Sequence, residues 1–92
     1  MKEESAAPIT ALATAMHAGT PADSVAAMDA AEAHRQHISR WFYECTYEIH
    51  LGLGEMYVAD PRFRATYEKM APGLAEYLRD AIVANAARHA TG

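Results

Sequence analysis

The segment from His34 to Tyr57 carries most of the chemically versatile side chains of this 92-residue chain. It holds the lone cysteine, the lone tryptophan, three of the five histidines and three of the five tyrosines. Imidazole and thiol groups ligate metals or act as bases and nucleophiles, whereas clustered aromatic rings bind flat, apolar ligands. The segment therefore suggests a metal centre, a nucleophilic site or an aromatic groove.

A metal centre would use His34 and His37, which lie one helical turn apart, with His50 or Glu48 as a third donor. Zinc and di-metal centres on helices are assembled from such donors. However, no matching acidic motif occurs elsewhere in the chain. The pattern therefore favours histidines that are partly exposed or hydrogen-bonded, and we predict neither a metal nor another cofactor.

A nucleophilic site would use Cys45, because the start of a helix and a nearby histidine can lower the pKa of a thiol. The flanking Glu44 and Glu48 act in the opposite direction. A free cysteine is more often a small buried apolar residue. We therefore predict no catalytic residue, and a single cysteine excludes an internal disulfide bond.

An aromatic groove is the third interpretation, because the segment holds more rings than a small core needs. His34, His37 and Trp41 share one helical face, and a second face adjoins the same break in the chain near residues 43–46. This second face is formed by Tyr47, His50, Gly54 and Tyr57. Two such faces would line a groove for a flat, ring-rich ligand. The alternative is that half of the rings fill the core and the others lie on the surface.

The scaffold around this segment reads as helical throughout. Helix signals predict one helix from Pro8 to Gly19, a second from a Thr20 cap to about Tyr43, and a third from a Thr46 cap over about 47–59. Asp60 and Pro61 predict the start of a fourth helix, and Pro72 both ends it and opens a fifth. We expect a compact, all-α five-helix bundle in which a flexible segment, residues 1–7, precedes a single domain, residues 8–92.

Apolar stripes at helical spacing predict which faces form the core. The second helix would bury Val25, Met28, Ala31, Ile38 and Phe42. The third would bury Ile49, Leu53 and Met56, and the fifth Leu74, Tyr77, Leu78, Ala81, Ile82 and Asn85.

Charge and composition restrict the partners. The net charge is −4, and the eight basic residues are spread along the chain rather than clustered. Binding to nucleic acid uses clustered cationic groups, so no direct nucleic-acid partner is expected. There is no apolar run long enough for a signal peptide or a membrane span. We therefore predict a cytoplasmic protein that has no membrane partner.

Beyond these patterns, the chain resembles the antibiotic-recognition domain of the TipA (thiostrepton-induced protein) family, the ligand-binding part of certain MerR-type multidrug regulators. The matching phrases are PADS (21–24), AMDAAEAHRQ (27–36), FYEC-x-YE-x-H (42–50), GLGEMYVADPRF (52–63) and PGLAEYLRDAI-x-ANA-x-RH (72–89). They follow one another in order over most of the chain, which makes the resemblance far more specific than any single motif.

The resemblance implies a globin-like fold without haem that holds thiopeptide antibiotics, or other bulky ring-rich drugs in relatives, in a cleft between helices. Members sense drugs when fused to a DNA-binding module and sequester drugs when made alone. Since the MerR part is absent here, we expect a stand-alone binder or an effector domain excised from a regulator. The alternative is a helical dimerisation or interaction module that forms a homodimer.

By position, the resemblance implies a set of ligand-binding residues. They are His34, Ile38, Trp41, Tyr43, Cys45, Tyr47, His50, Gly52 and Tyr57. Trp41 and the tyrosines would stack on the drug, the two histidines would hydrogen-bond to it, and Gly52 with Gly54 would shape the cleft.

Two departures from the family pattern bear on how a drug would bind. In thiopeptide-trapping members, a cysteine on the third helix captures a dehydroalanine of the drug as a thioether, and Gly52 stands at the matching position. Cys45 aligns instead with the family's other cysteine, so we predict non-covalent binding. The chain also begins after most of an N-terminal segment that closes over the ligand in the family, and we therefore expect a more open cleft and weaker binding.

Overall fold

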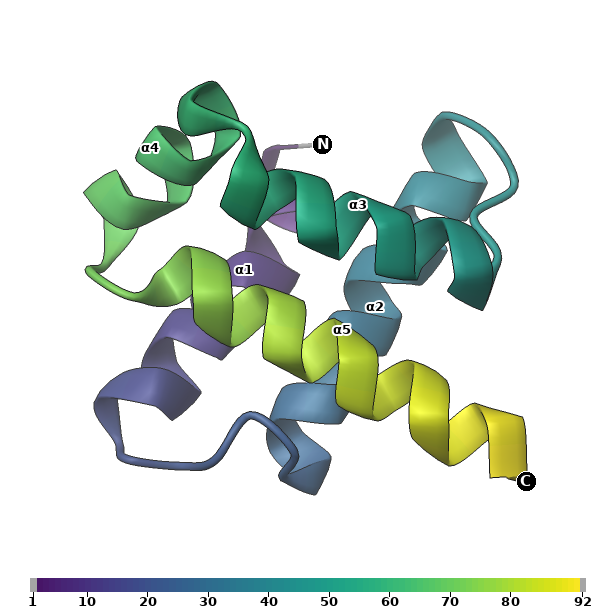
Figure 1. The fold of residues 1–92 in the computed structure, drawn as a ribbon, viewed down its shortest axis with the longest axis horizontal. Helices are drawn as coiled ribbons and strands as arrows, with labels where there is room; N and C mark the ends of the chain where they lie inside the picture. The colour runs from purple at the N-terminus through teal and green to yellow at the C-terminus, as the bar shows by residue number, and fades with distance from the viewer. Residues whose placement is uncertain (1, 92) are drawn as a thin grey trace.

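Five α-helices make up the computed structural model, which describes the backbone of residues 2–91 and the side chains of residues 8–90. They are α1 (Lys2–His17), α2 (Val25–Trp41), α3 (Tyr47–Ala59), α4 (Pro61–Met70) and α5 (Leu74–Thr91). α3 and α5 lie side by side and run in opposite directions, while α1 and α2 pack behind them (Figure 1). The all-α, compact five-helix fold is confirmed.

The first helix differs from the prediction at its start and agrees with it at its end. α1 begins at Lys2 and continues through Pro8 rather than starting there. The predicted flexible segment, residues 1–7, falls on side chains outside those described. At the other end, Gly19 adopts φ +80°. Its N–H donates to the Met16 carbonyl, and the Thr20 N–H donates to the Ala15 carbonyl. This left-handed closure is the predicted helix stop.

The second helix begins four residues later than its sequence signal suggested. Thr20 is occupied in closing α1, so Pro21 opens a turn in which the Ser24 N–H donates to the Pro21 carbonyl. Ser24 is the true cap, and its hydroxyl accepts from the Ala27 N–H at 3.2 Å. α2 ends at Trp41, two residues before the predicted end at Tyr43.

The later helix starts follow their local signals more closely. The Thr46 hydroxyl accepts from the Ile49 N–H at 3.1 Å, and the Asp60 carboxylate accepts from the Arg62 N–H at 2.9 Å. Both predicted caps are confirmed. α5 starts at Leu74, two residues after Pro72, because Gly73 turns the chain with φ +88°. The Glu68 carboxylate then accepts from the N–H groups of Gly73 and Ala75, at 2.8 and 3.2 Å.

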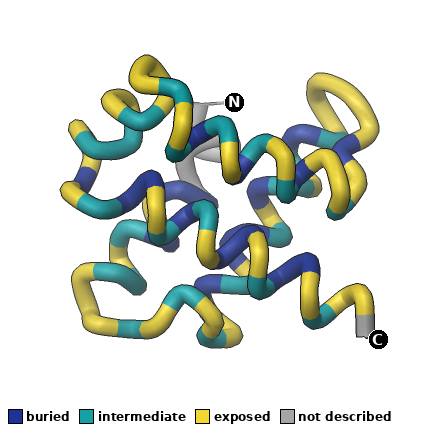
Figure 2. The backbone as a smooth tube through the Cα atoms, viewed as in Figure 1, coloured by how far each residue is buried: buried dark blue, intermediate teal, exposed yellow. Residues whose placement is uncertain are grey.

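The core lies where α1, α2, α3 and α5 meet (Figure 2). The predicted stripe of α5 is buried, except that Tyr77 is only partly so; its hydroxyl donates to the Thr20 carbonyl at 2.7 Å. Val25 and Phe42, predicted as core in α2, are exposed instead. α4 buries no residue fully and covers one end of the bundle.

The third helix is rotated from the predicted orientation: of the three predicted core residues, Leu53 and Met56 are partly buried against the core and Ile49 is exposed. His50, Gly54 and Tyr57 are buried, whereas Ile49 is 42% exposed. The reason is the contact with α5. A Cβ atom placed on Gly54 would lie 3.3 Å from Cδ1 of Ile82 and 3.6 Å from Cα of Arg79. The lack of a side chain at Gly54 lets α3 approach α5 this closely, and that approach turns the mixed polar row inward.

Candidate functional site

His34 of α2 and His50 of α3 form a buried pair, with Nδ1 of His34 2.9 Å from Nε2 of His50. Burial, with a smaller contribution from His37, lowers the pKa of His34 to about 4. Burial, the neighbouring His34 and Arg35 lower the pKa of His50 to about 3, against a raising effect of Glu32. Both imidazoles are therefore neutral at pH 7, so one ring donates its N–H and the other accepts it.

Tyr57 joins this pair to the aromatic residues of α4. Its ring centroid lies 6.1 Å from that of His34, 5.8 Å from Phe63 and 5.2 Å from Tyr67. We call His34, His50, Tyr57, Phe63 and Tyr67 the ring cluster. Burial raises the pKa of Tyr57, and the nearby hydroxyls of Tyr67 and Tyr43 raise it further. Since Phe63 is 40% exposed, the cluster reaches from the interior to the surface.

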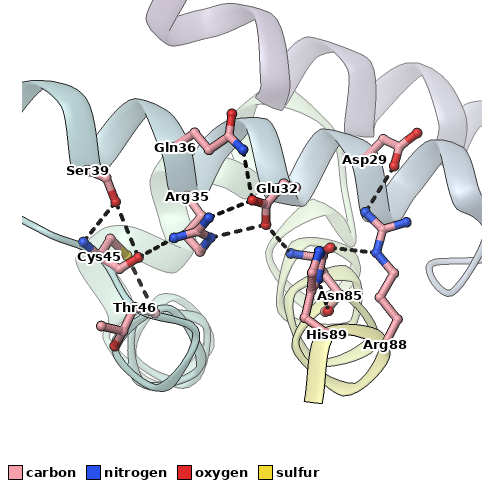
Figure 3. A network of polar contacts seen from close by, with 10 residues as sticks. All are labelled: Asp29, Glu32, Arg35, Gln36, Ser39, Cys45, Thr46, Asn85, Arg88 and His89. Atoms are coloured by element: carbon pink, nitrogen blue, oxygen red, sulfur yellow. Dashed lines mark hydrogen bonds and ion pairs between the residues drawn. The ribbon is translucent and has the colours of Figure 1, made fainter. Parts of the chain in front are cut away.

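A polar network centred on Glu32 links α2 to α5 and to the loop before α3, as Figure 3 shows. The Glu32 carboxylate accepts from Arg35 at 2.6 and 3.1 Å, from Gln36 at 2.9 Å and from Asn85 of α5 at 2.9 Å. Burial alone would raise the pKa of Glu32, but the hydrogen bonds from Arg35, Asn85 and Gln36 outweigh it and lower this pKa to about 2. The network ties α2 to α5.

The loop between α2 and α3 is held by the same network. Arg35 donates to the Cys45 carbonyl at 2.7 Å, and the Cys45 N–H donates to the Ser39 hydroxyl at 2.9 Å. Cys45 is fully buried, and burial raises the pKa of its thiol although Arg35 lowers it in part. A buried thiol with a raised pKa is a poor nucleophile, and the burial agrees with the expectation that a free cysteine is a small buried apolar residue.

Three consecutive aromatic residues lie on the surface where α2 ends. Trp41, Phe42 and Tyr43 are 52%, 72% and 49% exposed. The Arg40 guanidinium lies 5.2 Å from the centre of the Trp41 ring, and Phe42 meets His37 edge-on at 6.2 Å. These rings form an exposed aromatic corner, and exposed aromatic surface of this kind is typical of binding sites.

A hollow of about 440 Å³ lies next to this corner, between α1 and α2. It is lined by Pro8, Ala11, Ala30, Ala33, Gln36, His37 and Arg40. A volume of this size falls within the range of small-molecule sites in proteins, about 300–1,000 Å³.

The predicted site residues separate into three groups. His34, Ile38, Cys45, His50 and Tyr57 are buried. Trp41 and Tyr43 are half-exposed, and Gly52 is exposed with open space around its Cβ position. Tyr47 stacks on His89 at 4.6 Å and on Arg35 at 4.2 Å.

The prediction that two faces oppose each other across an open gap is wrong, because His34 and His50 are in direct contact. Sequence reasoning also missed two parts of the surface. The i, i+4 spacing of Phe63 and Tyr67 could have placed rings of α4 beside Tyr57. The small residues Ala30 and Ala33, on the face of α2 that also carries His37, could have indicated the hollow.

The described residues contain no group of three or more His, Cys, Asp or Glu side chains placed to hold a metal ion. In the same part of the chain, no helix is both long enough and apolar enough to span a bilayer.

Comparisons with known proteins agree with the resemblance seen in the sequence. The TipAS antibiotic-recognition domain family matches residues 1–85. The chain is 62% identical over 74 residues to the HTH-type transcriptional activator TipA of Streptomyces coelicolor, which covers 80% of this chain and 29% of TipA. It is 40% identical over 72 residues to the HTH-type transcriptional regulator SkgA of Caulobacter vibrioides, and the match covers 77% of this chain and 28% of SkgA. The chain thus spans less than a third of these curated relatives.

Two solved structures have the same fold. TipAS of Streptomyces lividans in complex with nosiheptide matches with a TM-score of 0.87 and 54% identity, over 95% of this chain and 61% of that one. The antibiotic-binding domain of a TipA-class multidrug resistance transcriptional regulator matches with a TM-score of 0.81 and 56% identity. This match covers 91% of this chain and 90% of that domain. The family is one of antibiotic-binding domains, not of enzymes. The family match and the shared fold together show that this chain belongs to the TipAS antibiotic-recognition domain family.

Proposed function

We propose that this chain binds thiopeptide-type macrocyclic antibiotics non-covalently, and so sequesters them or acts as the sensing part of a regulator. The observation that carries the proposal is the likeness, at a TM-score of 0.87 and 54% identity, to TipAS in complex with nosiheptide.

The exposed aromatic corner and the surface edge of the ring cluster are the proposed contact area. Trp41 and Tyr43 present half-exposed rings, and the Tyr43 hydroxyl acts on Tyr57, whose ring meets the partly exposed Phe63. Flat heterocycles gain stacking energy and apolar burial on such rings. The buried His34, Ile38, Cys45 and His50 would hold these rings in position rather than touch the drug.

Tyr47 and Gly52 would belong to the flank of this contact area on α3. Tyr47 is held by Arg35 and His89, so its ring is fixed before any ligand arrives. Gly52 leaves an open surface above the helix. A fixed ring next to an open surface reduces the entropy that a bulky ligand loses on binding.

The non-covalent mode follows from the state of Cys45. It is the only thiol of the chain, it is fully buried, and burial raises its pKa. Addition of a thiol to a dehydroalanine requires an accessible thiolate, which Cys45 does not offer.

A titration with nosiheptide tests both halves of the proposal. We expect saturable quenching of Trp41 fluorescence at one drug per chain, and an unchanged intact mass after denaturation. The absence of saturation contradicts binding, and a mass increase equal to the drug contradicts the non-covalent mode. In the Gly52→Cys variant, the open position would carry an exposed thiol, and we expect that variant to gain the mass of the drug.

We also infer a globin-like helix arrangement without haem and a cytoplasmic location. The family membership supports both. Superposition on a globin with the helices matched in order would test the first, and cell fractionation with an antibody against the chain would test the second.

A further inference from the structure

The hollow between α1 and α2 has the features of a second ligand site, one for molecules much smaller than a macrocycle. Pro8 and Ala11 of α1 and Ala30 and Ala33 of α2 supply its apolar lining. Because alanine side chains end at Cβ, the two helices leave about 440 Å³ between them that larger residues would fill. The lining is therefore suited to a flat apolar body.

The described lining of this hollow carries a charge opposite to that of the whole chain. The net charge is −4, yet among the described lining residues Arg40 is the only one with a permanent charge, and none of them carries a carboxylate. Arg40 is held with its guanidinium 5.2 Å from the Trp41 ring centre. In the described part of the chain, Arg40 makes no ion pair, whereas Arg35, Arg62, Arg64, Arg79 and Arg88 each do.

The polar residues of the lining come from the second half of α2. Gln36 and Arg40 are one turn apart there, and Gln36 is oriented by its hydrogen bond to Glu32 at 2.9 Å. A guanidinium that lines an apolar hollow and has no ion pair among the described residues favours an anionic group on the ligand, because a charge-assisted hydrogen bond there is about twice as strong as a neutral one.

We propose that the hollow between α1 and α2 binds flat apolar organic monoanions, such as aromatic sulfonates or carboxylates, with the acid group on Arg40 and the ring body against Ala30 and Ala33. The inference does not rest on the binding of thiopeptides. Its probes contain no macrocycle, so either proposal can fail while the other holds.

The test uses two fluorescent probes that share nearly the same body. The anionic probe is 8-anilinonaphthalene-1-sulfonate, and the neutral one is N-phenyl-1-naphthylamine. We expect saturable binding of the anionic probe to the native chain, with energy transfer from Trp41, which lies beside Arg40. In Arg40→Gln, affinity for the anionic probe should fall about tenfold, and affinity for the neutral probe less than about twofold.

Two further variants complete the test. Arg62→Gln removes an exposed arginine of α4 that pairs with Asp60, and it should leave both affinities unchanged. Ala33→Leu fills the hollow from an exposed position and should abolish binding of both probes. Equal losses in Arg40→Gln and Arg62→Gln would overturn the inference, and so would tight binding of either probe to Ala33→Leu. Cooperative urea unfolding of each variant ensures that dye bound to loosened protein is not counted.

Discussion

His34 and His50 contact each other through ring nitrogens 2.9 Å apart, across the space between α2 and α3. Two neutral imidazoles share one hydrogen bond there, and the helices that carry them are joined by a short loop that Arg35 and Ser39 hold in place. Of the two rows that the sequence presents as a groove, His34, His50 and Tyr57 thus form a buried seam, whereas Trp41 is half-exposed.

The first prediction concerns stability below neutral pH. The native pKa values of His34 and His50 are about 4 and about 3, below the ordinary value of 6.5. The unfolded chain therefore binds more protons between about pH 6.5 and pH 4, so stability falls as the pH falls. From pH 7 to pH 5 the free energy of unfolding should drop by on the order of 3 kcal/mol, measured by urea unfolding.

The groups that face the pair set the limits of this prediction. His37 acts on His34, while Arg35 and Glu32 act on His50, and the Glu32 pKa of about 2 keeps that carboxylate charged over the whole interval. A double variant with His34→Gln and His50→Gln should lose most of the slope between pH 7 and pH 5. Removal of the exposed His17 should preserve the slope, and a pH-independent wild type would contradict the prediction.

The second prediction separates two glycines on the same helix. Gly52→Ala adds a methyl group where nothing lies within 4 Å, so the helix propensity of alanine should stabilise the protein by up to about 1 kcal/mol. Gly54→Leu forces a side chain against Ile82 and the α5 backbone, and should destabilise it by about 2 kcal/mol or more. Urea unfolding of the two variants checks the opposite signs. A Gly54→Leu variant as stable as the wild type would refute the close approach of α3 and α5.

The third prediction concerns the carboxylate that links α2 and α5. Glu32→Ala leaves Arg35 and Asn85 without their shared acceptor in a mostly buried setting, and should lower the free energy of unfolding by about 2–3 kcal/mol. Glu55→Ala, which removes an exposed partner of Arg79, is the matched control and should cost less than about 0.5 kcal/mol. The measurement is denaturant unfolding. Equal losses in the two variants would show that the Glu32 network adds no more to the free energy of unfolding than an exposed ion pair does.

The fourth prediction tests the proposed drug-contact area. Trp41→Ala and Tyr43→Ala should each weaken nosiheptide binding about tenfold, because each removes a half-exposed ring available for stacking. Their melting temperatures should stay within a few degrees of the wild type, since neither ring belongs to the core. Val83→Ala, on the exposed face of α5, is the control, and calorimetric titration is the measurement. Unchanged affinity in both ring variants would place the drug elsewhere.

Local signals in the sequence were sufficient for most of the helix boundaries. Thr46 and Asp60 cap their helices through side chains that reach only two or three residues ahead, and the Gly19 stop is equally local. The predicted Thr20 cap is wrong because the Thr20 N–H closes the end of α1, and Ser24 caps α2 instead. A threonine before a proline is compatible with either the end of one helix or the start of the next, so the sequence alone does not distinguish the two.

The face that α3 turns inward could not be read from its own residues. The stripe of Ile49, Leu53 and Met56 is the more apolar one, but the lack of a side chain at Gly54 brings α5 close on the neighbouring face, which leaves Ile49 exposed and Leu53 and Met56 only partly buried. That choice depends on Ile82, twenty-eight positions away in the chain, and no periodicity of α3 encodes it. The burial of His34 and His50 follows from the same contact and could not be anticipated either.

The hydrogen bonds of Glu32 have a consequence for drug selectivity. Its two oxygens receive four N–H groups, from Arg35, Gln36 and Asn85, and a carboxylate has about four lone-pair positions to offer. A positively charged amine on an incoming molecule therefore finds this acceptor already saturated. For the proposed antibiotic binding, we therefore expect selectivity to depend on molecular shape and ring stacking, because protonated amines gain no advantage from Glu32.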